Sequence, residues 1–312
     1  MSRTLAFLFP GQGSQNVGMG KALAEHFPAA AAVFAEADEV LGVKLSALCF
    51  AGPEDELRLT VNAQPAILTA SVAALRVLEQ EAGVSPAYVA GHSLGEYAAL
   101  VAAGALAFPD ALRVTRERGR LMQEAVPVGA GAMAALFGLS EDDVRHICAE
   151  AAGHEVVAPA NLNGGGQVVI AGHAGAVRRA VAIAKARGAK RAVELAVSAP
   201  FHCPLMAGAA DGLARVLASV PLRPLNAGVI ANVTAALNRD HLQVKDLLVR
   251  QVTAPVRWEE SMRRLRALGC EAAVEIGPGR VLSGLLKRIV PELPCVSFGD
   301  AATLAEVRGV LT

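Results

Sequence analysis

The sequence lacks a net charge, paired cysteines and a long apolar segment, and each absence argues against a class of protein. Lys plus Arg and Asp plus Glu both number 29, and this balance argues against a basic nucleic-acid-binding protein. The five cysteines are scattered and form no C-x-x-C pair, so neither a disulfide framework nor a cysteine zinc site is indicated, and a reducing cytoplasm is favoured. We find no run of 18 or more predominantly apolar residues, and therefore expect no membrane-spanning segment.

What is present is a globular composition. The chain has 312 residues, of which 53% are hydrophobic and 19% charged. This mixture provides for a large core, excludes global disorder, and corresponds to about two domains by length. The apolar run Leu5–Phe9 leads into Pro10-Gly11-Gln12-Gly13 without a cleavage-site pattern. It predicts a buried strand and not a signal peptide.

Strands and helices are expected to alternate in the first third of the chain, which favours an α/β core with a mostly parallel sheet. The expected strands and helices are Thr4–Phe9, Lys21–Val40, a helix capped by Asn62 and ending near Ala82, Ala87–Ala90, Leu94–Ala103 and Pro109–Ala125. The same pattern resumes near the end of the chain, with a strand at Ala272–Ile276 and a helix at Val281–Ile289.

Residues 128–197 have a different order of expected strands and helices, which predicts an inserted domain. The expected order is a strand at Ala132–Phe137, a helix opened by Ser140, strands at Glu155–Ala160 and Gln167–Ala171, a helix at Ala174–Arg187 and a strand at Lys190–Val197. This β-α-β-β-α-β order is that of the ferredoxin-like unit. We therefore divide the chain into a core of residues 1–127 and 198–312 and a small subdomain of residues 128–197.

The sharpest local motif is Gly91-His92-Ser93-Leu94-Gly95, which fits G-x-S-x-G between an expected strand and an expected helix. A tight strand-to-helix turn exposes the serine hydroxyl above the sheet, and only small flanking residues leave room for that backbone. The hydroxyl then lies at a helix N-terminus, where the Leu94 N–H can stabilise an oxyanion. Ser93 is therefore the candidate nucleophile.

A serine nucleophile needs a base, and His202 is the leading candidate among seven histidines. It lies in a loop bracketed by Pro200 and Pro204, directly after the predicted subdomain. No Asp or Glu occupies a comparable loop between Ser93 and His202, so a full catalytic triad is not evident and a backbone carbonyl is a possible orienting group.

Two further features leave alternatives open. Gly11 and Gly13 follow a strand, but Asn16 replaces the third glycine of a dinucleotide fingerprint, so a loop that donates a backbone N–H to an oxyanion fits better. Four arginines crowd one expected helix, namely Arg113, Arg116, Arg118 and Arg120. If one of them points inward, its guanidinium can clamp a carboxylate, but spacing alone does not choose which.

Together these segments resemble the malonyl-CoA:acyl carrier protein transacylases and the acyltransferase domains of polyketide synthases. The resemblance extends over nearly the whole chain. It is carried by Phe9–Gln15, Gly91–Tyr97, Arg118-Gly119, Met122–Ala125, Gly131–Ala134, Asn161–Asn163, Gln167–Gly172, Phe201-His202, Gln251 and Glu275–Gly279.

The resemblance implies roles for these positions. Ser93 would carry the acyl group and His202 would act as general base and acid. Arg118 would pair with the free carboxylate of the malonyl group. The backbone N–H groups of Gln12 and Leu94 would form the oxyanion hole.

Three more positions receive supporting roles from the same resemblance. The backbone carbonyl of Gln251 would orient the catalytic histidine, and His92 would line the pocket. Phe201 would narrow the pocket against an α-methyl branch. The resemblance also implies an α/β-hydrolase-like core with a ferredoxin-like insertion.

The implied reaction is transfer of malonyl from malonyl-CoA, through a malonyl-serine, to the phosphopantetheine thiol of an acidic acyl carrier protein that binds transiently. No metal or bound cofactor, nucleic acid or membrane is expected, and the chain is expected to be a cytoplasmic monomer. Four basic residues are candidate carrier contacts: Lys190, Arg191, Lys287 and Arg288. The alternatives are an acyl thioesterase, a noncatalytic carrier-binding subunit, and a stand-alone acyltransferase of a polyketide or malonate decarboxylase pathway.

Overall fold

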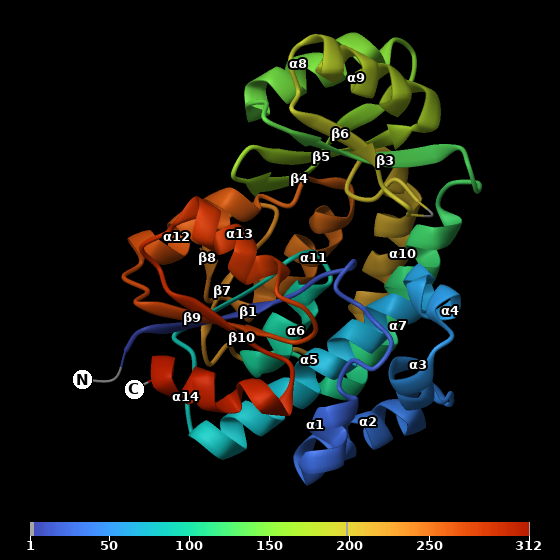
Figure 1. Cartoon of the computed structure of the whole chain (residues 1–312). Helices are drawn as coiled ribbons and strands as arrows, with labels where there is room; N and C mark the ends of the chain where they lie inside the picture. Colours follow the sequence, from blue (N-terminus) through green and yellow to red (C-terminus); the bar gives the residue numbers. More distant parts are fainter. Residues whose placement is uncertain (1–2, 198, 312) are drawn as a thin grey trace.

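The computed structural model describes residues 3–197 and 199–311, and two sheets organise this part of the chain (Figure 1). The elements before the small sheet are β1 (Leu5–Phe9), α1 (Lys21–His26), α2 (Pro28–Leu41), α3 (Leu45–Ala51), α4 (Glu54–Arg58), α5 (Thr60–Ala82), β2 (Tyr88–Gly91), α6 (Gly95–Ala102) and α7 (Phe108–Glu124). The small sheet and its helices are β3 (Gly131–Phe137), α8 (Glu141–Ala152), β4 (Val157–Gly164), β5 (Gln167–His173), α9 (Ala174–Ala186) and β6 (Arg191–Glu194). The elements after it are α10 (Ala207–Ala218), β7 (Gly228–Ile230), β8 (Leu237–Asn238), α11 (Val244–Thr253), α12 (Trp258–Ala267), β9 (Ala272–Ile276), α13 (Val281–Ile289), β10 (Cys295–Phe298) and α14 (Leu304–Leu311).

Within the described residues the larger sheet has the strand order β10-β9-β1-β2-β7-β8. Its strands pair in parallel, except that β8 runs antiparallel to β7. Helices cover both faces of this sheet (Figure 1), so β1 is buried along its whole length. Such a strand must be apolar on both sides. The predicted α/β class with a mostly parallel sheet is confirmed.

The two faces of β1 pack into different halves of the core. Phe7 and Phe9 join the cluster that includes α5 and α6, whereas Ala6 and Leu8 join the cluster that includes α12 and α13. The alternation follows from the two-residue period of a strand. Because β1 and β2 are neighbours in the centre of the sheet, the loops after both strands open at the same edge. That edge carries the site described below.

Helix α5 corrects the expectation that the chain has no apolar segment of membrane-spanning length. By its length and its mean hydropathy of 1.3, the helix Thr60–Ala82 is long and apolar enough to cross a membrane. However, 83% of its apolar window is buried inside the protein. The small residues and polar side chains interspersed along this helix hid its overall apolar character from a search for an unbroken run. Its burial identifies it as the central helix of the core.

The smaller sheet has the order β4-β5-β3-β6, with antiparallel pairing throughout, and α8 and α9 pack on its outer side (Figure 1). Backbone hydrogen bonds from Leu162 N to Val256 O (2.9 Å) and from Val256 N to Ala160 O (2.9 Å) join β4 to the segment before α12. These backbone hydrogen bonds attach the small sheet to the rest of the chain close to the edge of the larger sheet where β1 and β2 end.

Several element boundaries differ from the sequence expectation. The helix expected over Lys21–Val40 is two helices, α1 and α2, because Phe27 is extended and Pro28 starts a new first turn. Asn62 lies inside α5 and does not cap it; its side chain donates to the Glu56 carbonyl. The strand expected over Lys190–Val197 covers only β6. Ser140 caps α8 through the predicted capping box with Asp143.

Candidate active site

Ser93 lies in the turn between β2 and α6 with a φ of 51°. This left-handed conformation is unusual for a residue other than glycine and occurs where surrounding structure enforces it. The turn is possible because Gly91 and Gly95, two positions before and after the serine, have no Cβ. A Cβ on Gly91 would lie 1.9 Å from the Gly95 carbonyl carbon, and a Cβ on Gly95 would lie 2.0 Å from the Phe9 carbonyl oxygen.

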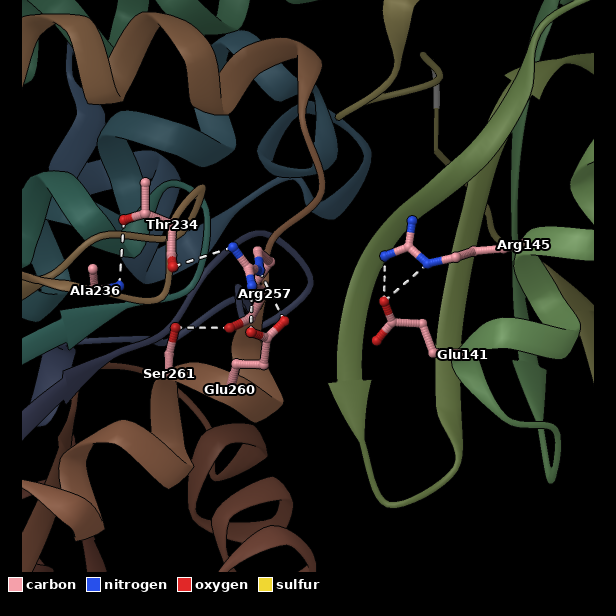
Figure 2. Close-up of polar contacts among 7 residues, drawn as sticks. All are labelled: Glu141, Arg145, Thr234, Ala236, Arg257, Glu260 and Ser261. Carbon is pink, nitrogen blue, oxygen red and sulfur yellow. Dashed lines mark hydrogen bonds and ion pairs between the residues drawn. The ribbon is translucent and has the colours of Figure 1, made fainter.

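Asn232, which sequence reasoning missed, holds this turn. Its Oδ1 accepts a hydrogen bond from the Ser93 N–H at 2.7 Å, and its Nδ2 donates to the Gly91 carbonyl at 2.7 Å. The Arg257 N–H in turn donates to the Asn232 carbonyl at 3.1 Å, and Arg257 Nη1 donates to the Thr234 carbonyl at 3.2 Å. Figure 2 shows the Arg257 contact to Thr234. A loop more than 130 residues from the serine therefore stabilises its strained backbone.

Arg257 is itself fixed at the start of α12. It pairs with Glu260, and the Ser261 hydroxyl donates to its carbonyl at 2.7 Å (Figure 2). The hydrogen bond that Arg257 donates to Glu260 raises the pKa of Arg257, and Glu141 on α8 adds to this effect. Glu141 pairs with Arg145 on the same helix (Figure 2). Glu141, on a helix that packs on the small sheet, thus adds to the electrostatic environment of Arg257 at the start of α12.

Ser93 and His202 meet at hydrogen-bond distance. Ser93 Oγ lies 2.7 Å from His202 Nε2, and His202 Nδ1 lies 2.8 Å from the main-chain carbonyl oxygen of Gln251. A carbonyl oxygen only accepts, so Nδ1 carries the proton and Nε2 is free to accept the serine proton. Burial, and next the nearby Arg118 cation, lower the pKa of His202 to about 3. The imidazole is therefore neutral at physiological pH.

Arg118 is the member of its cluster that points inward. It is 2% exposed, whereas Arg113 and Arg120 pair with acidic side chains of the same helix, and Arg116 Nη1 donates to Asn62 Oδ1 at 2.8 Å. Helix α7 is strongly amphipathic, and Arg118 falls on its buried face. The spacing of the four arginines in the sequence did not show which of them points inward.

The guanidinium of Arg118 is held by neutral groups. Nη1 donates to Gln64 Oε1 at 2.6 Å, and Nη2 donates to Gln251 Oε1 at 2.9 Å and to Ser93 Oγ at 3.2 Å. Among the described residues, no carboxylate lies within ion-pair distance of Arg118 and Nε has no hydrogen-bond partner. A buried cation without a direct counter-ion is costly. Its positive charge stands beside the serine hydroxyl, where it can receive an anionic group.

The remaining predicted residues surround one cavity of about 730 Å³. Gln12, Leu94 and Phe201 line it together with Ser93, His202, Arg118 and His92, and Gln12 Nε2 donates to Thr60 Oγ1 at 3.0 Å. Gln251 is fully buried behind the cavity wall. Every predicted site residue is therefore in the cavity or directly behind it. A second hollow, of about 640 Å³ between α1, α2 and α3, contains none of them.

His92 turns away from the serine hydroxyl, as the strained turn predicts. Its Nε2 lies 2.8 Å from Asn163 Oδ1 on β4, and its ring packs against Trp258 with centroids 5.4 Å apart. Burial lowers the pKa of His92, so it is neutral. The side chain links the serine turn to β4 of the small sheet and is not a second base.

Glu96, a further residue that sequence reasoning missed, belongs to a buried polar network behind the serine. Glu96, 3% exposed, accepts from the Asn232 N–H at 3.1 Å and from Gln251 Nε2 at 2.7 Å. Gln251 Nε2 also donates to the Ser93 carbonyl at 3.0 Å. The only sequence signal for Glu96 was an acidic residue directly after the G-x-S-x-G motif. Among the described residues, no three His, Cys, Asp or Glu side chains gather closely enough to hold a metal ion.

Comparison with known proteins identifies the family of this chain. Residues 6–304 match the acyl transferase domain family. The chain belongs to this family. It is 50% identical over 300 residues to the malonyl CoA-acyl carrier protein transacylase of Escherichia coli strain K12, covering 96% of this chain and 97% of that protein.

Solved structures give the same result. An acyl carrier protein S-malonyltransferase from Vibrio cholerae superposes with a TM-score of 0.95 at 49% identity, covering 97% of this chain and 99% of that one. A malonyl-transacylase solved in complex with its type II PKS acyl carrier protein superposes with a TM-score of 0.96 at 47% identity, covering 98% of this chain and 99% of that chain. The family membership expected from the resemblance is confirmed, and so is the α/β class of the fold.

Proposed function

We propose that this acyltransferase moves a malonyl group from malonyl-CoA to the phosphopantetheine thiol of an acyl carrier protein and so supplies the extender unit for fatty acid synthesis. The observation that carries the proposal is the buried Arg118, whose Nη2 lies 3.2 Å from Ser93 Oγ and which has no carboxylate of the described chain in contact. An acyl group on Ser93 that bears its own carboxylate supplies the missing counter-ion. The names of the close relatives agree with this substrate.

In the first half-reaction, Ser93 Oγ attacks the thioester carbonyl carbon while His202 Nε2 takes the hydroxyl proton. The 2.7 Å contact places base and nucleophile at the distance that proton transfer needs. The Gln251 carbonyl, 2.8 Å from Nδ1, holds the tautomer and stabilises the imidazolium that forms. His202 then returns the proton to the sulfur, and coenzyme A leaves as the thiol.

The tetrahedral intermediate carries a negative oxygen that needs donors already in place. We assign this role to the backbone N–H groups of Gln12 and Leu94, two residues that line the cavity beside Ser93. Leu94 stands at the N-cap of α6, so its N–H belongs to a helix N-terminus. Both are main-chain donors: Gln12 lies in the loop after β1, and Leu94 lies in the turn after the neighbouring parallel strand β2.

In the second half-reaction, the carrier thiol attacks the malonyl-serine ester and His202 repeats its role as base and acid. This is ping-pong transfer through a covalent intermediate. Arg118 pairs with the malonyl carboxylate throughout, and Phe201, 8% exposed at the cavity wall, limits space beside the α-carbon. An acetyl group would leave the buried cation unpaired, which disfavours it.

The partner in this reaction is an acidic carrier protein that binds transiently, and the chain itself acts as a cytoplasmic monomer without a cofactor. Support for a carrier comes from the related transacylase solved with its own carrier protein. The candidate contacts are four exposed basic residues: Lys190, Arg191, Lys287 and Arg288.

The same proposal includes the finer division of the fold. We assign residues 1–127 and 198–312 to an α/β-hydrolase-like core and residues 128–197 to a ferredoxin-like subdomain, where residues 1–2, 198 and 312 lie outside the described residues. The strand order β4-β5-β3-β6 and its antiparallel pairing support the ferredoxin-like description. The cavity lies between the two units, with Met133 and Asn161 contributed by the small one.

Intact-protein mass spectrometry tests the function. The chain is incubated with malonyl-CoA, and holo carrier protein is then added. We expect a stable gain of one malonyl group that is absent in Ser93→Ala and is discharged by the carrier. An adduct lost to water without carrier would instead establish a thioesterase. No adduct with malonyl-CoA or other acyl-CoAs would leave the noncatalytic carrier-binding subunit.

A further inference from the structure

Glu96 is a fully enclosed carboxylate close to the reacting atoms that the reaction steps above do not use. It lies three residues after Ser93 in the first turn of α6. Burial raises its pKa to about 7, even though Gln251, Asn232 and the Arg118 cation all favour the charged form. Enclosing an ionisable group costs free energy that an apolar side chain of similar size would not.

The Glu96 carboxylate contacts one end of the Gln251 amide. Nε2 of Gln251 donates to Glu96 Oε2 at 2.7 Å and to the Ser93 carbonyl at 3.0 Å. Both of these oxygens are acceptors when Glu96 is charged. The amide nitrogen is therefore the favoured atom at this end.

The other end of the same amide contacts Arg118. Gln251 Oε1 accepts from Nη2 at 2.9 Å, and a guanidinium only donates. Rotating the amide by 180° would place its NH₂ against the guanidinium and its oxygen against two acceptors. Glu96 and Arg118 thus select one orientation of Gln251 from opposite sides.

We propose that Glu96 is a positioning residue: it holds the Gln251 amide with Oε1 toward Arg118 and so determines the preference for acyl groups that carry a carboxylate. The inference rests on the proposed malonyl transfer. It assigns no contact between Glu96 and the substrate. Glu96 acts on acyl-group preference through the side chain of Gln251, whereas the main-chain oxygen of Gln251 orients His202. A change in acyl-group preference can therefore be measured separately from a change in proton transfer.

Two conservative substitutions distinguish the role of Glu96 as a hydrogen-bond acceptor from the role of its negative charge. Glu96→Gln keeps an oxygen within reach, because the two donors from Asn232 and Gln251 select the amide oxygen, and it removes the charge. Glu96→Asp keeps the charge but withdraws it from Gln251 by one methylene. Glu275→Gln is the matched control, since Glu275 is also buried but accepts from Leu282 N and Ser283 N at the start of α13.

The measured quantity is the ratio of the rate constants for Ser93 acylation by malonyl-CoA and by acetyl-CoA. We expect Glu96→Asp to lower this ratio about 10-fold, in line with loss of one hydrogen bond to a charged group. Glu96→Gln and Glu275→Gln are expected to keep the ratio within about 3-fold of the parent chain. An unchanged ratio in Glu96→Asp, or an equal fall in Glu96→Gln, would overturn the proposal.

A double-mutant cycle tests the route. Gln251→Leu is expected to lower the ratio, and adding Glu96→Asp to Gln251→Leu is expected to lower it no further. An additional fall would show that Glu96 acts through another residue, such as Asn232, and would overturn the route through Gln251. Malonyl loading of the unaltered chain is measured first, so its absence would refute the proposed function and not the role of Glu96.

Discussion

His202 Nδ1 lies 2.8 Å from the main-chain oxygen of Gln251, in the place where a catalytic triad has a carboxylate. A carbonyl oxygen fixes the imidazole tautomer as a carboxylate does, but it brings no negative charge to raise the basicity of the ring. The position of the histidine therefore depends on the backbone of α11. Its low basicity follows from burial and from the neighbouring Arg118 cation.

The first prediction concerns the pH dependence of acylation. Since burial and Arg118 lower the pKa of His202 to about 3, the imidazole stays neutral well below the ordinary histidine value of 6.5. We expect the acetyl-CoA acylation rate in Arg118→Ala to fall at a higher pH than in the unaltered chain, because the substitution removes a positive charge that opposes imidazolium formation. The measurement is Ser93 acylation from about pH 3 to pH 8, so that the acidic limb of the unaltered chain falls within the range. Acidic limbs that coincide in the two proteins would contradict the influence of Arg118.

The second prediction concerns acyl selectivity. Arg118→Ala is expected to slow malonyl loading by about two orders of magnitude, as for truncation of one partner of a buried charged pair, and to increase acetyl loading. Arg116→Ala is the control on the same helix, because Arg116 faces Asn62 and not the cavity. The assay is acylation by each acyl-CoA followed by mass spectrometry. Malonyl preference that survived in Arg118→Ala would remove Arg118 from its assigned role.

The serine turn and its base were predictable from the sequence because their chemistry is local. Gly91, Ser93 and Gly95 form a motif in five consecutive residues, and the proline-bracketed loop marked His202. The parallel sheet followed from the alternation of strands and helices. These signals depend on neighbouring residues, which a single sequence contains in full.

The supporting network was not predictable because its members are far apart in the chain. Asn232 accepts a hydrogen bond from the N–H of Ser93, which lies 139 residues away in the chain. Gln251 donates a hydrogen bond to Glu96, which lies 155 residues away. Helical spacing also could not choose Arg118 over its neighbours, since the buried face of α7 is set by packing against α5 and α10. The break at Pro28 was overlooked because the apolar periodicity continues across it.

The third prediction is a pH dependence of stability that comes from Glu96. Its pKa is raised from 4.5 to about 7 in the folded chain, so between these values the folded state binds more protons than the unfolded state. The contribution of Glu96 to stability is therefore present below pH 4.5 and is lost as the pH rises to about 7. The side chain in Glu96→Gln does not titrate, so it makes no such pH-dependent contribution.

We accordingly expect the free energy of unfolding of Glu96→Gln, minus that of the unaltered chain, to increase from pH 4.5 to 7. The increase should be at most about 1.4 kcal/mol per pH unit and should level off at higher pH. Urea denaturation at several pH values measures the difference, and subtraction cancels the opposite slope from His202. A difference that is constant across this range would show that Glu96 is charged throughout.

The last prediction contrasts two glycines whose surroundings differ. In Gly95→Ala, the new Cβ would lie 2.0 Å from the Phe9 carbonyl oxygen, and the main chain of β1 would have to move. Gly284 also lies in a helix, but a Cβ there meets nothing within 4 Å. We expect Gly95→Ala to lower the free energy of unfolding by about 3 kcal/mol or more, and Gly284→Ala to raise it by about 0.5–1 kcal/mol. Equal effects in denaturant titrations would show that the serine turn has room to relax, and the account of Ser93 as a backbone held by close packing would then be wrong.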